Sequence, residues 1–379
     1  MKHFRSIDGL RAWLAWTVVL CHVTLQTGAD RKWSLIEKLE NSGVQAVCIF
    51  IIISGFVITH LLLEKREDYL PYISRRFLRI YPIYFICLCL GIGATFLHIQ
   101  AFADPPAGVI VPQPELFALE LGSLNNGDLV WQLAAHLTLL HGAISNHILP
   151  ASSYMFLGPA WSLSLEWQFY VVAPLILVSL RTRTGQVLVA LVTVAAYGAY
   201  QQGWLGQFFD PSFLPGAGLY FAVGIATRLL FTKLPVFKTY PLAAMIVALG
   251  FCFMNHRLLP FMFWAGFIAW LRTVPADAQT GNFVGVALNA AFNSRMAQYL
   301  GARSYSTYLI HEPIIHTVVF LCIKRFALGL LPTTLVTLLV TVPLTLVASI
   351  VLYRLVEAPA IAYGRRLFSG VPVRPVIPA

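Results

Sequence analysis

Stretches of about 18 to 22 apolar residues recur along this chain, each long enough to cross a hydrocarbon core of about 30 Å as an α-helix. Lipid offers the backbone no hydrogen-bonding partner, so a spanning segment must satisfy its own N–H and C=O groups, as a helix does. The 379 residues are 58% hydrophobic and 11% charged, whereas about a quarter of the residues in a soluble domain are charged. We therefore predict an all-α fold, a polytopic membrane helical bundle.

The apolar segments predict about ten transmembrane helices. Their approximate ranges are 7–26, 43–63, 80–99, 163–180, 186–203, 212–230, 240–255, 258–272, 302–322 and 331–353. These helices would form one transmembrane domain over residues 1–360, followed by a cytoplasmic tail over 361–379 that we expect to be disordered. A homo-oligomer is compatible with this organisation.

The basic residues lie mostly between the apolar segments. A net charge of +10 could indicate nucleic-acid binding, but no soluble basic face with interleaved aromatic residues is present, so we expect no nucleic-acid partner. If the N-terminus is cytoplasmic, most Lys and Arg residues fall in cytoplasmic loops. The connection over about 100–162 contains no Lys or Arg and should face outward. We expect a multi-pass protein of the plasma or inner membrane with both termini in the cytoplasm.

Ionisable residues interrupt the first apolar segment, FRSIDGLRAWLAWTVVLCHV. Arg11 and His22 are eleven residues apart, so they share one helix face at a separation of about 16 Å along the axis. Asp8 can pair with Arg11 on that face. Ionisable residues inside a membrane helix usually line a functional cavity. The alternative is that Asp8 and Arg11 anchor the helix at the interface while His22 is a core residue.

Glu166 lies about one turn inside the fourth predicted helix, in PAWSLSLEWQFYVVAPL, at the depth expected for His22. A carboxylate bonded to one imidazole nitrogen would fix the tautomer and leave the other nitrogen as a general base for a hydroxyl. Trp161 and Ser164 of the same segment are predicted to line the cavity. Alternatively, Glu166 lies in the headgroup region and hydrogen-bonds Ser162 or Ser164.

The segment YISRRFLRIYPIY carries Arg75, Arg76 and Arg79. Arg75 and Arg79 are i, i+4 neighbours, and forked guanidinium hydrogen bonds suit phosphate groups. We predict that these three arginines bind the phosphates of a nucleotide-bearing thioester. Anchoring under the positive-inside rule explains the same residues without a ligand.

Two further segments contribute predicted cavity residues. SYSTYLIHEPIIH places Tyr305, His311 and Glu312 in the ninth predicted helix, where an intramembrane His-Glu pair indicates cavity lining or support of the site. FIIISGFVIT contributes Ser54, and the small residues around it allow a neighbouring helix to approach closely. We expect no metal site, because the histidines of the external segment do not have standard zinc spacing.

These five segments occur in the order and spacing of the membrane acyltransferase-3 family, which the chain resembles from about residue 4 to Pro359. The resemblance implies a ten-helix bundle that O-acylates sugars of lipopolysaccharide, exopolysaccharide or similar surface carbohydrates, using acyl-CoA from the cytoplasm. The family's first-helix Arg and His correspond to Arg11 and His22. Its Glu-bearing motif corresponds to Glu166.

The family's cytoplasmic arginine pair corresponds to Arg76 and Arg79, or to Arg75 and Arg79. From this we predict that coenzyme A phosphates bind these arginines, and that His22, oriented by Glu166, deprotonates the sugar hydroxyl. An acyl-histidine intermediate is the competing scheme. The donor is expected to be acyl-CoA, with acetyl favoured, and no permanently bound cofactor is expected.

A transporter or proton-coupled flippase of a glycan or small molecule is the alternative function. Intramembrane Asp, Glu and His residues also form proton relays. Such a protein would be expected to contain inverted repeats, and the sequence shows no convincing repeat.

Overall fold

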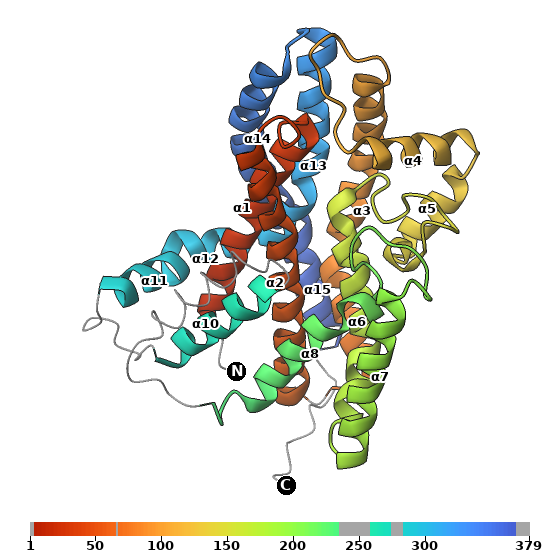
Figure 1. Cartoon of the computed structure of the whole chain (residues 1–379). Coiled ribbons are helices and arrows are strands. Elements are labelled where there is room, and N and C mark those ends of the chain that lie inside the picture. Colours follow the sequence, from red (N-terminus) through yellow and green to blue (C-terminus); the bar gives the residue numbers. More distant parts are fainter. Residues whose placement is uncertain (1–3, 66, 235–257, 274–282, 369–379) are drawn as a thin grey trace.

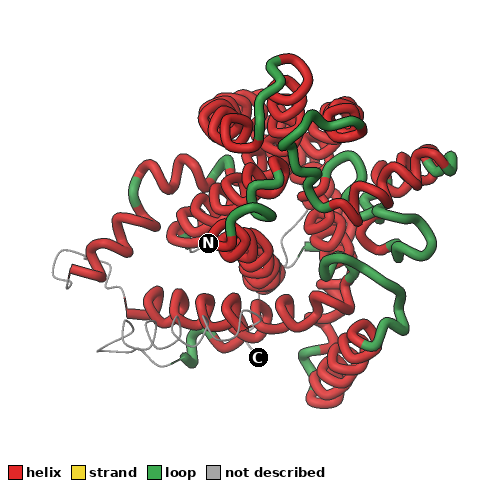
Figure 2. Tube along the Cα trace, turned by 45° about the horizontal axis from the view of Figure 1, so that its top comes forward, coloured by secondary structure: helices red, strands yellow, loops and turns green. Residues whose placement is uncertain are grey.

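The computed structural model describes residues 4–65, 67–234, 258–273 and 283–368 (Figure 1). Within these ranges every regular element is a helix, and the tube view contains helices and loops without a strand (Figure 2). The all-α prediction is confirmed. Both views show long helices packed side by side with shorter helices at the periphery.

The described helices are bounded as follows. They are α1 (Arg5–Thr27), α2 (Ser34–Glu64), α3 (Tyr69–Ala103), α4 (Pro114–Asn125), α5 (Leu129–Leu137), α6 (Trp161–Ser179), α7 (Arg183–Gln201), α8 (Leu214–Leu230), α10 (Leu259–Thr273), α11 (Phe283–Asn293), α12 (Arg295–Gly301), α13 (Ser304–Phe320), α14 (Leu330–Leu352) and α15 (Ala358–Leu367). Short 3₁₀ turns, η1 (His141–Ala143) and η2 (Gly158–Ala160), precede α6, and π-helical turns η5 (Leu321–Arg325) and η6 (Tyr353–Glu357) follow α13 and α14.

The prediction of about ten spans is not confirmed over the residues that the structure describes. Five helical segments in the described ranges are long and apolar enough to cross a membrane: Ser42–Glu64, Tyr69–Ala103, Gly158–Ser179, Ser304–Arg325 and Leu330–Leu367. Two shorter apolar helices are Leu214–Leu230 and Leu259–Arg272. The predicted spans over 7–26 and 186–203 are helices, although neither is among the five. Charged and polar side chains lower the mean hydropathy of α1. The predicted span over 240–255 lies outside the described residues.

Helix α15 crosses the start of the predicted tail. The boundary at residue 360 falls inside α15, which continues through Leu367. This helix packs on α3, and the Cβ position of Gly364 lies 3.2 Å from the Leu78 side chain. Packing against a neighbouring helix can stabilise a segment whose composition resembles a tail. Residues 369–379 lie outside the described part.

Helix α1 contacts several of the longer helices. It packs against α2, α13 and α14, and near its start against α11 and α12 (Figure 1). Leu10, Val18 and Val19 of α1 are fully buried. The polar residues of α1 therefore lie among neighbouring helices, where charged or polar partners can reach them.

The small residues predicted around Ser54 do bring two helices together. The ideal Cβ of Gly55 in α2 would lie 2.6 Å from the carbonyl oxygen of Phe221 in α8, and that of Gly224 would lie 2.1 Å from the carbonyl oxygen of Ile52. Real Cβ atoms do not approach backbone oxygen this closely, so only glycine fits. Small residues at such crossings allow the van der Waals contact that drives association of helices in lipid.

Replacing Gly224 with Ala is expected to destabilise the protein by at least about 1–3 kcal/mol, because the added methyl group forces α2 and α8 apart. The measurement is the thermal unfolding midpoint in detergent. Gly198→Ala in α7 is the matched control. A Cβ there meets nothing within 4 Å, so helix propensity should leave that variant as stable as the wild type or more stable by up to about 1 kcal/mol. Equal midpoints for both variants would contradict the close α2–α8 contact.

Candidate active site

A cavity of about 120 Å³ lies inside the bundle, and we call it the central cavity. Its lining comes from α1, α2, α3, α6, α8, the α12–α13 region and η6. The lining residues are Asp8, Arg11, Phe50, Ile51, Ser54, Arg79, Ile80, Ser162, Leu163, Glu166, Phe221, Gly301, Ala302, Ser304, Tyr305, Tyr308 and Glu357. Six residues predicted from the sequence, Asp8, Arg11, Ser54, Arg79, Glu166 and Tyr305, therefore lie around one space.

The carboxylate of Glu166 is held by two hydroxyl groups. Its Oε1 accepts a hydrogen bond of 2.9 Å from Ser54 Oγ and another from the Tyr170 hydroxyl. Ser54 belongs to α2, whereas Tyr170 lies one turn further along α6, so one neighbouring helix and the helix of Glu166 itself fix the position of the carboxylate. A buried polar group with such partners is restrained in orientation.

The arginines of the central cavity lie among acidic groups. The Arg11 guanidinium interacts electrostatically with Asp8 and Glu166, and also with Arg79. Arg79 interacts in turn with Glu357 and Glu166. Charges inside a membrane protein need such compensation. The cavity thus combines fixed cations and fixed anions within an apolar bundle.

Arg76 lies beside the central cavity without lining it. It interacts electrostatically with Arg79 and Glu166, and its Nε is buried without a hydrogen-bond partner among the described residues. An unsatisfied buried guanidinium donor is costly. Arg76 therefore retains capacity to bind an anionic group.

Arg75 contacts a different part of the molecule. It forms an ion pair with Glu67, and its Nη2 donates a hydrogen bond of 3.2 Å to the Phe368 carbonyl oxygen. Its guanidinium also lies 5.7 Å from the centre of the Phe368 ring. The three arginines predicted to bind phosphates therefore do not form one site. Arg75 and Arg79 contact different neighbours despite their i, i+4 spacing.

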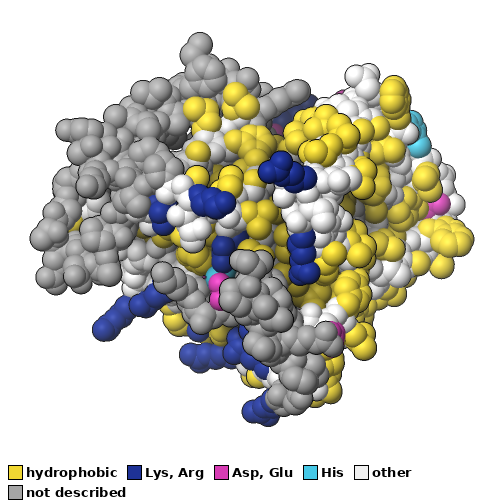
Figure 3. Space-filling model, turned by 90° about the horizontal axis from the view of Figure 1, so that it is seen from below, with side chains coloured by type: hydrophobic (Ala, Val, Ile, Leu, Met, Phe, Trp, Pro, Cys, Tyr) yellow, Lys and Arg dark blue, Asp and Glu magenta, His cyan; other side chains and the backbone are white. Residues whose placement is uncertain are grey.

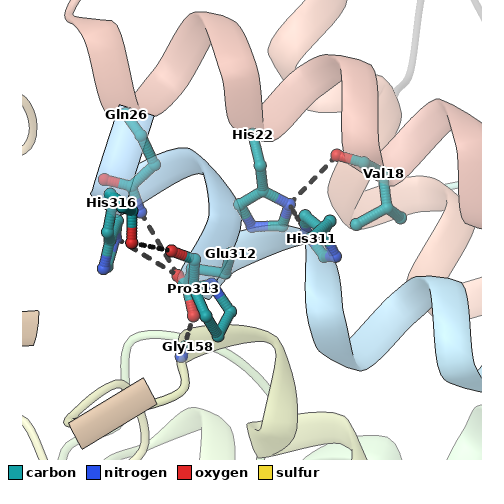
Figure 4. Close-up of polar contacts among 9 residues, drawn as sticks. Val18, His22, Gln26, Gly158, His311, Glu312, Pro313 and His316 are labelled. Atoms are coloured by element: carbon teal, nitrogen blue, oxygen red, sulfur yellow. Dashed lines mark hydrogen bonds and ion pairs between the residues drawn. The ribbon is translucent and has the colours of Figure 1, made fainter. Parts of the chain in front are cut away.

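His22 lies outside the central cavity and against α13. Its Nδ1 lies 3.0 Å from the Val18 carbonyl oxygen and 3.2 Å from His311 Nε2 (Figure 4). Only one proton can occupy Nδ1. If Nδ1–H donates to Val18, the tautomer leaves Nε2 of His22 with a free lone pair, as a general base requires.

The predicted pairing of Glu166 with His22 is wrong. Glu166 accepts its hydrogen bonds from Ser54 and Tyr170, and it interacts electrostatically with Arg11. Arg11 and His22 are separated by about 16 Å along α1. The depth of Glu166 in α6 therefore matches that of Arg11, and the imidazole is positioned by a backbone carbonyl and a second histidine.

The other predicted cavity residues are buried elsewhere. Trp161 is packed in the apolar core. Ser164 is fully buried, and its Oγ accepts hydrogen bonds from the Gly142 N–H at 3.1 Å and from Gln168 Nε2 at 3.4 Å. His311 is fully buried beside His22. Ser164 thus ties α6 to the segment before it.

A cluster of polar residues adjoins the His22–His311 pair. Glu312 accepts hydrogen bonds from Gln26 Nε2 at 3.3 Å and from the Gly158 N–H at 2.5 Å (Figure 4). His316 Nε2 lies 3.9 Å from the same carboxylate. Gln26 is one helical turn beyond His22 in α1. This cluster therefore continues the polar face of α1 that carries Arg11 and His22, starting at Gln26.

Sequence reasoning missed three residues of these sites. Glu357 lines the central cavity and accepts a 2.6 Å hydrogen bond from Ser306 Oγ, but the last predicted helix ended at residue 353. His98 and His316 lie on α3 and α13 with stacked rings 4.1 Å apart. Their presence inside apolar segments is itself the signal that marks functional residues in membranes.

The family model described as "Acyltransferase domain" matches residues 4–354. This range contains all the residues of the central cavity except Glu357. No solved structure matches the chain.

Several named proteins are similar to this chain. The acyltransferase MdmB of Streptomyces mycarofaciens is 31% identical over 173 residues, covering 45% of this chain and 38% of that protein. The peptidoglycan O-acetyltransferase OatA of Listeria monocytogenes serovar 1/2a is 24% identical over 341 residues, covering 83% of this chain and 50% of that protein. A putative O-acetyltransferase of Staphylococcus aureus strain COL is 26% identical over 185 residues, or 48% and 26% of the two chains. The matches span half or less of each relative.

Proposed function

This chain belongs to the acyltransferase-3 family, and from that premise we propose that it is a membrane O-acyltransferase. The donor is acyl-CoA, in the first instance acetyl-CoA, supplied from the cytoplasm. The acceptor is a hydroxyl of a cell-surface or lipid-linked carbohydrate. The relatives named as O-acetyltransferases support the reaction type.

The central cavity is the observation that carries this proposal. Arg11 and Arg79 line it, and Arg76 lies beside it with an unsatisfied Nε. Guanidinium groups bind phosphates through forked, charge-assisted hydrogen bonds. Glu166 interacts electrostatically with both Arg11 and Arg79, and Glu357 interacts with Arg79. A nucleotide-bearing thioester is an anionic ligand of suitable chemistry.

The proposed orientation places this donor site toward the cytoplasm. Lys and Arg side chains gather on the lower face of the molecule (Figure 3), as the positive-inside rule predicts for a cytoplasmic face. The segment over 104–157 has no Lys or Arg, and its helices α4 and α5 lie in the upper part of Figure 1, away from that lower face. Both termini would then be cytoplasmic, and the protein would lie in the plasma or inner membrane.

The proposed general base is His22. Its Nδ1–H, held by the Val18 carbonyl oxygen, leaves Nε2 to take the proton of the acceptor hydroxyl. The hydroxyl oxygen forms a bond to the acyl carbon, the C–S bond breaks, and the proton passes from the imidazole to the departing thiolate. His311 restrains the His22 ring from the opposite helix at 3.2 Å. The acyl arm must pass along α1 from Arg11 to His22.

Labelled acetyl-CoA supplied to the purified protein in lipid nanodiscs tests the reaction. We expect release of free CoA together with transfer of label to a glycan fraction added on the other side of the bilayer. A transporter or flippase would move the glycan without consuming acetyl-CoA. Absence of CoA release with well-folded protein and a complete surface-glycan fraction would refute the proposed reaction.

A further inference from the structure

A groove of about 570 Å³ lies at the C-terminal end of α7, and we call it the external groove. Its walls come from the last turn of α7 and the loop after it, from α4 and from the segment after α5 (Figure 1). The volume is several times that of the central cavity and falls within the range of about 300–1,000 Å³ found for small-molecule sites. In the proposed orientation the groove faces the extracytoplasmic side, where surface carbohydrates are found.

The lining of the external groove combines aromatic rings with side-chain amides. The aromatic and amide residues are Tyr200, Phe208, Phe209, Asn146, Gln201 and Gln207. Among the described residues, the lining includes no Asp, Glu, Lys or Arg. Phosphates and other anions are bound most strongly by charged donors such as arginine. The composition of this groove therefore favours a neutral ligand.

The amide side chains are available to such a ligand. Within the ranges that the structure describes, no hydrogen bond joins the side chain of Asn146, Gln201 or Gln207 to the protein. A primary amide has two donor hydrogens and an acceptor oxygen, and a hydroxyl group can both donate and accept. These amides therefore match a ligand that carries many hydroxyl groups.

Hydrogen bonds hold two walls of the groove together. The Asn146 N–H donates a bond of 2.9 Å to the Gln207 carbonyl oxygen, and the Gln207 N–H donates one of 3.0 Å to Ser145 Oγ. Gly206 adjoins this contact with a φ of +110°, and a Cβ there would lie 2.5 Å from Ser145 Cβ. Glycine alone suits that position. A site whose backbone is fixed before binding loses less conformational entropy when the ligand arrives.

Aromatic rings form the apolar part of the groove. Tyr200 and Phe208 are stacked with ring centres 5.4 Å apart, and the Tyr200 hydroxyl donates a bond of 2.9 Å to the Asp210 carbonyl oxygen. Phe209 is 44% exposed, and its ring also packs edge-on against Tyr154. The face of an aromatic ring is electrically negative. The C–H groups on one face of a sugar ring are slightly positive, so a sugar can pack flat on such a ring.

The external groove is linked to the proposed base through a few side chains. Phe209 packs on Tyr154, and Tyr154 lines a small polar space of about 20 Å³ together with Glu312. Glu312 follows His311, whose Nε2 lies 3.2 Å from His22 Nδ1. That space has room for about one water molecule, so a sugar in the groove does not reach His22 through it. A sugar bound there would therefore be a different unit of the acceptor from the one that reacts.

We propose that the external groove binds an uncharged saccharide unit of the acceptor glycan, remote from the unit that is acylated. The sugar ring packs on Phe209, and its hydroxyl groups form hydrogen bonds with Asn146 and Gln207. This assignment rests on the proposed acyltransferase function. A remote unit adds affinity without entering the chemical step, so loss of the groove should raise the KM for the acceptor and leave kcat unchanged.

Neutral disaccharides test the binding directly. Cellobiose, lactose, maltose and diacetylchitobiose are each titrated against the full-length protein in nanodiscs by saturation-transfer NMR, with empty nanodiscs as the blank. We expect saturable binding of at least one of the four. Failure of all four to bind saturably would overturn the assignment and leave the exposed rings as anchors at the membrane surface.

Variants locate the binding. Asn146→Ala and Gln207→Ala should each weaken disaccharide binding about 3- to 10-fold, the loss expected for one neutral hydrogen bond. Phe209→Leu keeps an apolar side chain but removes the ring, with a loss of about the same size. Gln202→Ala is the matched control, because Gln202 is an exposed glutamine outside the lining, and it should bind as the wild type does. Thermal midpoints verify folding. Unchanged binding in all three folded test variants would sink the proposal.

Acetyl-CoA turnover separates this proposal from the proposed reaction. Gln207→Ala should raise the KM for a surface-glycan fraction about 3- to 10-fold at an unchanged kcat. Disaccharide binding that is weakened in Gln207→Ala, by a protein that releases no CoA, would support the sugar site while refuting the reaction. CoA release with the same KM in Gln207→Ala and Gln202→Ala would support the reaction while refuting the assignment of the groove.

Discussion

His22→Asn is expected to reduce acetyl transfer by at least about a hundredfold and up to about ten-thousandfold, the range associated with loss of a general base. Asparagine retains a side-chain donor for the Val18 carbonyl oxygen, which accepts from His22 Nδ1 at 3.0 Å. It cannot take a proton from a hydroxyl. The measurement is the initial rate of label transfer from acetyl-CoA to a glycan fraction, with the thermal midpoint as the test of folding.

The matched control is His147→Asn, at an exposed histidine that does not line the central cavity. It should retain full activity at a saturating amount of the glycan fraction. A brief incubation of wild-type protein with labelled acetyl-CoA and no acceptor adds a second readout. Label on the protein would indicate the acyl-histidine scheme, whereas unlabelled protein agrees with direct transfer. Transfer at more than a tenth of the wild-type rate in folded His22→Asn would rule out His22 as the base.

Arg79→Ala should weaken acetyl-CoA binding about 10- to 100-fold, because a charge-assisted hydrogen bond contributes about 1.5–3 kcal/mol. Arg79 lines the central cavity and interacts with Glu166 and Glu357. The loss should be largest at low ionic strength, since salt screens interactions with phosphates. Isothermal titration of the nanodisc protein with CoA measures the change in Kd.

Arg75→Ala is the matched control for Arg79→Ala, because both arginines lie on α3. Arg75 is only four residues away, but it pairs with Glu67 and bonds the Phe368 carbonyl oxygen outside the cavity. Its removal should change the Kd for CoA by less than about threefold, as expected for a partly exposed ion pair. Equal losses in Arg75→Ala and Arg79→Ala would favour a general basic surface over a specific donor site.

Local patterns in the sequence were sufficient to predict some of the helices. Apolar length predicted the membrane helices of α2, α3 and α14 because hydrogen bonding in lipid leaves a long apolar segment few alternatives. The same reasoning was less accurate at the C-terminus, where α14 continues through η6 into α15. A helix that packs on α3 needs fewer apolar residues than one that faces lipid.

For the site, the sequence determined which residues of α1 share a face, because Asp8, Arg11 and His22 are related by the geometry of a single helix. It also marked Glu166, Arg79 and Tyr305, since polar residues are costly in membrane helices. Only the tertiary structure decided their partners. The relative depth of two helices and the direction of long side chains depend on packing between segments, so Glu166 lies beside Arg11 while His311 reaches His22.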